Sequence, residues 1–235
     1  MRRGALILLA GTWLAGCASG HAALRDRTNA LLTDYRARVP APVTAPEGGA
    51  PRTWEVGQYV VYAVNRDGRP GLVRYAIEAR TAEGVWLGIQ ELSYDTQTLR
   101  RVLLEREPKQ AGELVTLARR AIVQAEGTAA RVYDFEVDSS PVVAKMREAM
   151  SPLWAAFLQA PSLPGEATTV STAAGRFEGA APTAVRLEVL GVVSDFTGRR
   201  HDAVPISGLV RAATPDETAS IELVEFGDDA ASPLF

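Results

Sequence analysis

The chain of 235 residues has one cysteine, Cys17, and two histidines, His21 and His201. A single cysteine excludes a disulfide within the chain and the cysteine clusters that hold structural zinc. Two histidines this far apart in sequence provide little material for a histidine-based metal site. We therefore expect no metal and no cofactor.

The sequence also lacks the short motifs of common catalytic sites. It has no Gly-x-Ser-x-Gly nucleophile elbow, no phosphate-binding loop and no dinucleotide fingerprint. The residues Asp195, His201 and Asp202 lie close in sequence and fit either a weak metal or acid/base cluster or a solvated loop, and we expect the loop. We predict no catalytic residues and therefore a protein that is not an enzyme.

Basic residues form no long run. The 25 Lys and Arg are outnumbered by 28 Asp and Glu, which leaves a net charge of -3. Nucleic-acid binding needs clustered basic residues that neutralise phosphates, so we expect no nucleic-acid partner. Apolar residues make up 47% and charged residues 23% of the chain, which excludes wholesale disorder.

No apolar run is long enough to cross a bilayer, which takes ~20 apolar residues. The run Ala5–Leu14 follows two arginines and precedes small residues, the pattern of a cleaved secretory signal peptide. The tetrapeptide Leu14-Ala15-Gly16-Cys17 resembles the lipobox of bacterial lipoproteins. This resemblance implies cleavage between Gly16 and Cys17 and a lipid on the Cys17 sulfur. A plain secretory peptide with an incidental cysteine is the alternative.

The lipobox divides the chain into a signal peptide (1–16), a lipidated tether with a helix and a linker (17–51), and one β-rich domain (52–235). The resemblance makes the membrane a partner through the lipid on Cys17. Ala18 stands where inner-membrane lipoproteins usually carry aspartate. We therefore expect a lipid-anchored protein of the outer membrane that faces the periplasm.

The tether contains one amphipathic segment. Residues 18–23 are small and predict a flexible connection, and residues 21–39 predict a helix. The apolar stripe of this helix comprises Leu24, Thr28, Leu31, Leu32, Tyr35 and Val39. The helix either docks on the body or lies near the membrane surface. Residues 40–51 are rich in Pro, Gly and Ala and predict an extended linker or a wrapping arm.

From Trp54 onward, alternating apolar residues and short turns predict an antiparallel sheet. The predicted strands are 58–64, 72–80, 85–94, 98–106, 119–125, 131–135, 168–172, 176–178, 183–193, 206–212 and 220–226. A helix is predicted over 139–158, and the tail 228–235 is expected to be frayed. The fold class is therefore α+β.

Four motifs resemble those of a group of bacterial envelope lipoproteins whose fold is similar to that of the lipoprotein carriers LolA and LolB. They are Trp54 to Tyr62, Ala174 to Phe177, Val204 to Val210 and Glu222 to Gly227. The resemblance implies a strongly curved antiparallel sheet, a half-open barrel with two or so helices covering its concave face. Gly175 and Gly208 are expected at bends or positive φ, and Pro205 at the start of an edge strand.

The chain also contains large apolar side chains that can contact a hydrophobic ligand. They form either plain core or a pocket for a lipid or acyl chain; the candidates are Tyr62, Trp86, Met146, Met150, Trp154 and Phe157. The pocket implies a non-enzymatic carrier or binder of a hydrophobic ligand. The alternative is an accessory lipoprotein that scaffolds an envelope complex, with an envelope protein as partner and no small-molecule ligand.

Overall fold

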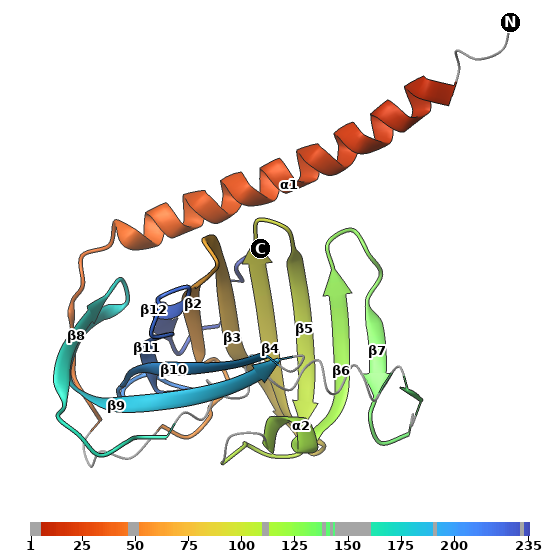
Figure 1. Ribbon diagram of the computed structural model, residues 1–235. Coiled ribbons are helices and arrows are strands. Elements are labelled where there is room, and N and C mark those ends of the chain that lie inside the picture. Colours follow the sequence, from red (N-terminus) through yellow and green to blue (C-terminus); the bar gives the residue numbers. More distant parts are fainter. Residues whose placement is uncertain are drawn as a thin grey trace, which may run out of the picture.

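The strands predicted by the alternating pattern pair into one large sheet (Figure 1). The computed structural model describes residues 6–46, 52–109, 113–137, 140–141, 143, 161–189, 192–230 and 233–235. Within these residues the sheet has twelve strands, antiparallel except for the parallel pair β1 and β9. The chain is therefore α+β, with an antiparallel sheet as its main element.

One half of the sheet is a meander in which neighbours in sequence are neighbours in space. Its strands are β2 (Tyr59–Arg66), β3 (Arg69–Thr81), β4 (Gly84–Ser93), β5 (Gln97–Leu104), β6 (Ala118–Ala125) and β7 (Arg131–Asp134). Asp67 and Gly68 join the first two strands with φ of 52° and 74°. Positive φ at both positions is typical of the tight hairpin turn that an Asp-Gly pair predicts. The predicted meander is confirmed.

The other half continues from β2 through β12, β11 and β10 to β9. The bounds are β1 (Pro42–Val43), β8 (Thr168–Thr172), β9 (Gly175–Val189), β10 (Val192–Arg200), β11 (Leu209–Ala213) and β12 (Ala219–Gly227). Two sequence predictions are wrong here. A single strand, β9, replaces the predicted pair 176–178 and 183–193, and β10 occupies residues expected to form a loop.

Gly179 and Pro182, which both weaken strands, lie between the two predicted strands. The β9–β10 ladder nevertheless includes Pro182, opposite Arg199, and Gly179 has φ of 80° where the β8–β9 register shifts. The Pro182 carbonyl accepts a hydrogen bond from the Leu163 N–H at 2.8 Å. Pairing along the whole of β10 therefore outweighs the local strand-breaking residues.

The sheet curves so that β9 and β10 pass in front of the upright strands β2–β4 (Figure 1). The face enclosed by this curve carries the main hydrophobic core, whose fully buried members include Tyr62, Tyr75, Leu87 and Leu223. Residues of the meander alternate between this inner face and an outer face, as expected for pleated strands. The predicted curved sheet is confirmed.

Helix α1 (Leu6–Arg36) packs on the outer face, not on the concave one. It forms a second core with Val61, Leu72 and Val224, which alternate in sequence with residues of the main core. The expected cover of the concave face by two helices is therefore wrong for α1. The other described helix, α2 (Glu113–Leu117), is one short turn at the end of β5. The predicted helix 139–158 lies outside the described residues except for positions 140, 141 and 143.

The amphipathic stripe correctly predicts how α1 docks. Leu24, Thr28, Leu32 and Tyr35 are all buried, with 7% exposure or less. Val39 is 90% exposed because the helix ends at Arg36, before the predicted end. The helix also runs through residues 18–23, which were expected to be a flexible connection. Of the two placements considered for the helix, docking on the body is confirmed.

The C-terminal tail is tied down between α1 and the sheet, so the predicted frayed end is wrong. Leu234 is buried, and its N–H donates to Gln90 Oε1 at 2.8 Å. Arg74 donates to the Ala230 carbonyl at 2.7 Å. The Arg27 guanidinium lies over the Phe235 ring at 5.8 Å. The tail therefore completes the second core.

The Pro-rich segment after α1 is a wrapping arm. Its strand β1 pairs in parallel with β9, placing Val43 opposite Phe177. Gly175 has φ of 153°, and a Cβ there would lie 2.5 Å from the Val43 Cγ2 atom. Glycine is therefore required for the arm to approach the sheet this closely.

A tight turn before β11 is buried beside the main core. Ile206 and Gly208 have φ of 66° and 71°, and Pro205 lies in this turn, not at the start of a strand as predicted. Trp54 Nε1–H donates to the Ile206 carbonyl at 3.1 Å. The Tyr62 hydroxyl donates to the Leu209 carbonyl at 3.0 Å and lies 2.5 Å from Ser207 Oγ.

We expect Tyr62→Phe to lower the free energy of unfolding by about 1–3 kcal/mol, because a buried carbonyl loses its donor. Urea denaturation followed by circular dichroism measures the change. Tyr133→Phe, at a half-buried position on β7, should change stability by less than about 0.5 kcal/mol. Equal stability of the Tyr62→Phe variant and the parent would show that this hydroxyl does not hold the turn.

The same variant should alter stability at alkaline pH. Burial raises the pKa of the Tyr62 phenol, so the folded state keeps the proton that the unfolded chain loses near pH ~10. The folded state binds more protons there, and stability therefore falls as pH rises above ~10. Part of this slope should be absent from Tyr62→Phe in denaturation curves recorded between pH 8 and 11.

Candidate functional site

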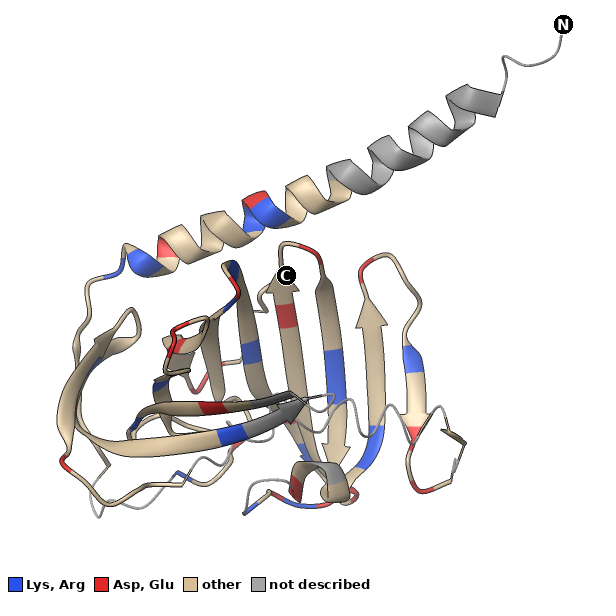
Figure 2. Cartoon of the chain, viewed as in Figure 1, with Lys and Arg blue, Asp and Glu red and all other residues tan. Residues whose placement is uncertain are grey.

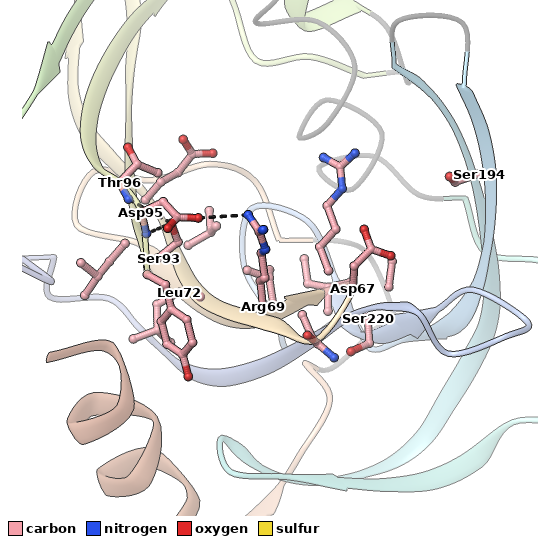
Figure 3. A pocket seen from close by; sticks show the side chains of 18 of the residues that line it. Asp67, Arg69, Leu72, Ser93, Asp95, Thr96, Ser194 and Ser220 are labelled. Atoms are coloured by element: carbon pink, nitrogen blue, oxygen red, sulfur yellow. Dashed lines mark hydrogen bonds and ion pairs between the residues drawn. The ribbon is translucent and has the colours of Figure 1, made fainter. Parts of the chain in front are cut away.

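A cavity of about 740 Å³ opens at the end of the sheet where the β2–β3 and β4–β5 turns lie (Figure 3). This volume is within the range of small-molecule sites, ~300–1,000 Å³. Its inner wall, here called the floor, consists of Val64, Val73, Phe196 and Ile221. Val73, Phe196 and Ile221 are buried members of the main core, and Val64 packs against it. The floor is thus a surface that an apolar chain can contact.

The cavity exists because the side chains at this end of the inner face are small. Gly71 lies opposite Val64 on β2 and Ser93 on β4, and Ala219 on β12 lies in the next row of the same face, opposite Arg66. Ser194 lies across the cavity on β10 (Figure 3). Further along the same strands this face carries large residues such as Tyr75, Ile77 and Leu87, which fill the space. Side-chain size therefore places the cavity at one end of the sheet.

The mouth of the cavity is charged. Its exposed lining residues, here called the rim, are Arg66, Asp67, Arg69, Asp95 and Thr96. Arg66 and Arg69 are paired across the β2–β3 hairpin, so their side chains leave the same face of the sheet. Arg69 forms an ion pair with Asp95 at 3.2 Å. Figure 2 shows basic and acidic residues side by side in this turn.

A partly buried ion pair stands between floor and rim. Glu91, which lines the cavity, contacts Arg100 with 2.5 Å between oxygen and nitrogen, and their side chains are 16% and 27% exposed. Burial raises the pKa of the nearby Tyr75 phenol well above its usual value, and the Glu91 charge adds to this effect. Tyr75 is therefore held in its neutral form beneath the cavity.

Two of the six predicted pocket residues lie in the described part of the chain, and they lie on opposite faces of the sheet. Tyr62 is fully buried in the main core. Trp86 alternates with the core residues Val85 and Leu87, so it lies on the outer face, where Arg101 covers its ring at 5.6 Å. The other four candidates, Met146, Met150, Trp154 and Phe157, lie outside the described residues.

Sequence reasoning missed the residues that line the cavity. Residues 65–71 were treated as turn, although β2 reaches Arg66 and β3 begins at Arg69. Ser194 and Phe196 lie on β10, which was not predicted. The available signal was Phe196, the one large apolar residue between Val193 and His201, which indicates a strand with one buried position.

The residues Asp195, His201 and Asp202 form no joint site. Asp195 pairs with Arg186 at 3.9 Å and Asp202 with Arg200 at 3.7 Å. His201 is only 4% exposed, which contradicts the expected solvated loop. In the described part of the chain, no group of three His, Cys, Asp or Glu is arranged to hold a metal ion.

His201 is a structural residue of the core. Its Nδ1 accepts a hydrogen bond from the Ala203 N–H at 3.2 Å, so Nε2 is left to donate to the Glu178 carbonyl at 3.0 Å. The ring meets Phe177 edge to face at 5.5 Å. Both nitrogens of a neutral imidazole are therefore used, and the histidine joins β9 to the turn after β10.

The Cys17 side chain lies outside the described side chains, although its backbone belongs to α1. Among the described residues, no helix is both long enough and apolar enough to cross a membrane.

Comparison with known proteins gives one structural likeness to report. No family model matches the sequence, and no curated protein matches it. A crystal structure from Bacteroides fragilis, of a protein described as exported and as having a YmcC-like fold, is similar with a TM-score of 0.30 and 9% sequence identity. The match covers 74% of this chain and 97% of that chain. A likeness this weak carries no argument about function.

We expect His201→Leu to lower the free energy of unfolding by about 1–3 kcal/mol, because the Ala203 N–H and the Glu178 carbonyl lose their partners. Thermal and urea denaturation measure this effect. Added Zn²⁺ should leave the melting temperature of the parent protein unchanged. A rise of the melting temperature with Zn²⁺ that His201→Leu abolishes would restore the metal-site interpretation.

Proposed function

We propose that this chain is an exported bacterial lipoprotein that binds or carries a hydrophobic ligand, a lipid or an acyl chain, without catalysing a reaction. It is anchored through a lipid on Cys17 in the outer membrane and faces the periplasm. The observation that carries the ligand proposal is the 740 Å³ cavity with its apolar floor and charged rim. The lipobox Leu14-Ala15-Gly16-Cys17 supports the anchor.

The shape and chemistry of the cavity favour an amphipathic ligand. An apolar chain on the floor would displace water from Val73, Phe196 and Ile221, and each buried CH₂ contributes ~0.8 kcal/mol. A polar head would remain at the rim, where charged groups are solvated. Long-chain lipids have both parts, whereas small polar metabolites would leave the floor in contact with water.

The motif resemblance also implies how the sheet is closed and covered. We infer a half-open barrel in which the segment 139–158 covers the concave face. Phe135 and Val143, the described core residues on either side of its start, are buried with 9% and 6% exposure and belong to the main core. This supports a path of the chain across the inner face at that point.

The alternative is a scaffold that binds an envelope protein, and one observation favours it. Strand β7 ends the described meander, and Val132 on it is 63% exposed. An open strand edge is a template for pairing with a strand of another protein. A scaffold of this kind would leave the cavity without a ligand.

We expect Ser194→Trp to fill the cavity and to lower lipid affinity roughly tenfold or more, the effect of about 1.4 kcal/mol. Native mass spectrometry of the gently extracted protein measures the lipid-bound fraction. Thr197→Trp is the matched control, because Thr197 is exposed on the opposite face of β10. The carrier proposal fails if the parent protein carries no lipid, or if both variants retain it equally.

We expect Cys17→Ser to move the protein from the membrane fraction to the soluble fraction, because lipidation at the sulfur supplies the anchor. More than one acyl chain is needed for firm attachment, and loss of the sulfur removes all of them. Fractionation with immunoblotting measures the distribution. Retention of the serine variant in the membrane fraction would disprove the anchor.

A further inference from the structure

The position of α1 connects the membrane anchor to the cavity. His21 Nδ1 lies 3.9 Å from an oxygen of Asp95, a rim residue that also pairs with Arg69. Tyr94 donates to Asn29 Oδ1 at 2.7 Å, and Arg27 donates to Gln97 Oε1 at 3.3 Å. Three contacts thus hold residues 21–29 of α1 against the β4–β5 turn, which borders the mouth.

The reach of the chain then limits how far the mouth lies from the membrane. Three residues separate Cys17 from His21, and the four Cα–Cα steps between them span at most ~14 Å even when fully extended. With the His21 side chain and its 3.9 Å contact to Asp95 added, a lipid on Cys17 holds Asp95 within about 20 Å of the anchored residue, whatever the conformation between them. The headgroup layer of a bilayer is itself ~5–7 Å thick on each side. The reach of the chain thus keeps the rim within about 20 Å of the anchored residue, close to that layer.

We propose that the cavity opens onto the membrane that anchors the chain and takes a phospholipid of that membrane, with its phosphate at the Arg66–Arg69 pair and its acyl chain on the floor. This inference rests on the proposed lipid anchor and the proposed lipid binding, and it names the ligand class and the direction from which the ligand enters.

The two arginines suit a phosphate group. They are neighbours across the hairpin, and each guanidinium offers five N–H donors in a planar fork that matches phosphate oxygens. In the part of the chain that the structure describes, no ion pair of Arg66 is seen. Arg69 is paired with Asp95, but both side chains are more than half exposed, and such surface pairs contribute only ~0–1 kcal/mol. Exchange of this carboxylate for a phosphate therefore costs little.

The first test measures the distance of the mouth from the bilayer. In the lipidated protein Cys17 is acylated, so Thr96→Cys provides one thiol on the rim for a fluorescent label. Ala82→Cys is the matched control, because Ala82 is exposed at the other end of β4, roughly 30 Å away. In vesicles with nitroxide-labelled headgroups, we expect quenching at position 96 and little at position 82. Equal quenching, or stronger quenching at 82, overturns the proposed orientation.

The second test examines the phosphate site. Native mass spectrometry compares phosphatidylglycerol with diacylglycerol that has the same acyl chains but no phosphate. We expect Arg66→Gln to lower affinity for phosphatidylglycerol about tenfold and to leave diacylglycerol unchanged. Arg131→Gln, an exposed arginine of β7 outside the lining, makes the same charge change and should affect neither lipid.

The remaining outcomes separate this inference from the proposed function. If Arg66→Gln lowers the affinity for both lipids equally, Arg66 does not bind the phosphate. If inorganic phosphate alone displaces the lipid, the site binds a free anion. Either result overturns the phospholipid assignment, while lipid binding stands. If the parent protein binds neither lipid, the proposed function fails as well, whereas the quenching experiment still decides the orientation.

Discussion

The fold depends on the burial of a strained polar turn beside its core. A β-branched residue with positive φ, as at Ile206, costs ~1–3 kcal/mol unless the surroundings hold it. Here Trp54 and Tyr62 donate hydrogen bonds to the Ile206 and Leu209 carbonyls, and the Ile206 side chain is buried. Because Trp54 and Tyr62 begin the meander and the turn begins β11, these bonds close the two halves of the sheet on each other.

Hydrogen bonds and packing contacts between the four sequence motifs explain why they occur together. Trp54 and Tyr62 of the first motif donate hydrogen bonds to carbonyls of the third. The Tyr59 hydroxyl of the first motif donates to Glu225 of the last. Phe177 of the second motif packs against Phe226 of the last at 6.0 Å. The motifs are therefore a set of mutual contacts in the core. They specify how the sheet curves, and none of them lies at the rim of the cavity.

How far the sequence predicts the molecule depends on whether local pattern or tertiary pairing decides each part. The hairpin at Asp67 and the docked stripe of α1 follow from turn chemistry and helical periodicity. Strand β10 does not, because Phe196 is its one large apolar residue between Val193 and His201, and pairing with β9 along nine positions stabilises it. The same holds for two of the predicted pocket residues: Tyr62 and Trp86 are both large and apolar, but strand parity puts them on opposite faces.

The two faces of the sheet are covered differently, and this difference explains why a cavity remains on the inner face. The outer face is closed by α1 and the C-terminal tail, whose Leu234 is buried against the sheet. The inner face is filled by large side chains at one end and left open at the other, where Gly71, Ser93 and Ala219 face Ser194. Water on the floor leaves apolar area exposed at a cost of ~25 cal/mol per Å². Helix α1 docks at this same end, so a lipid on Cys17, as proposed, would lie near the apolar floor formed by the described residues.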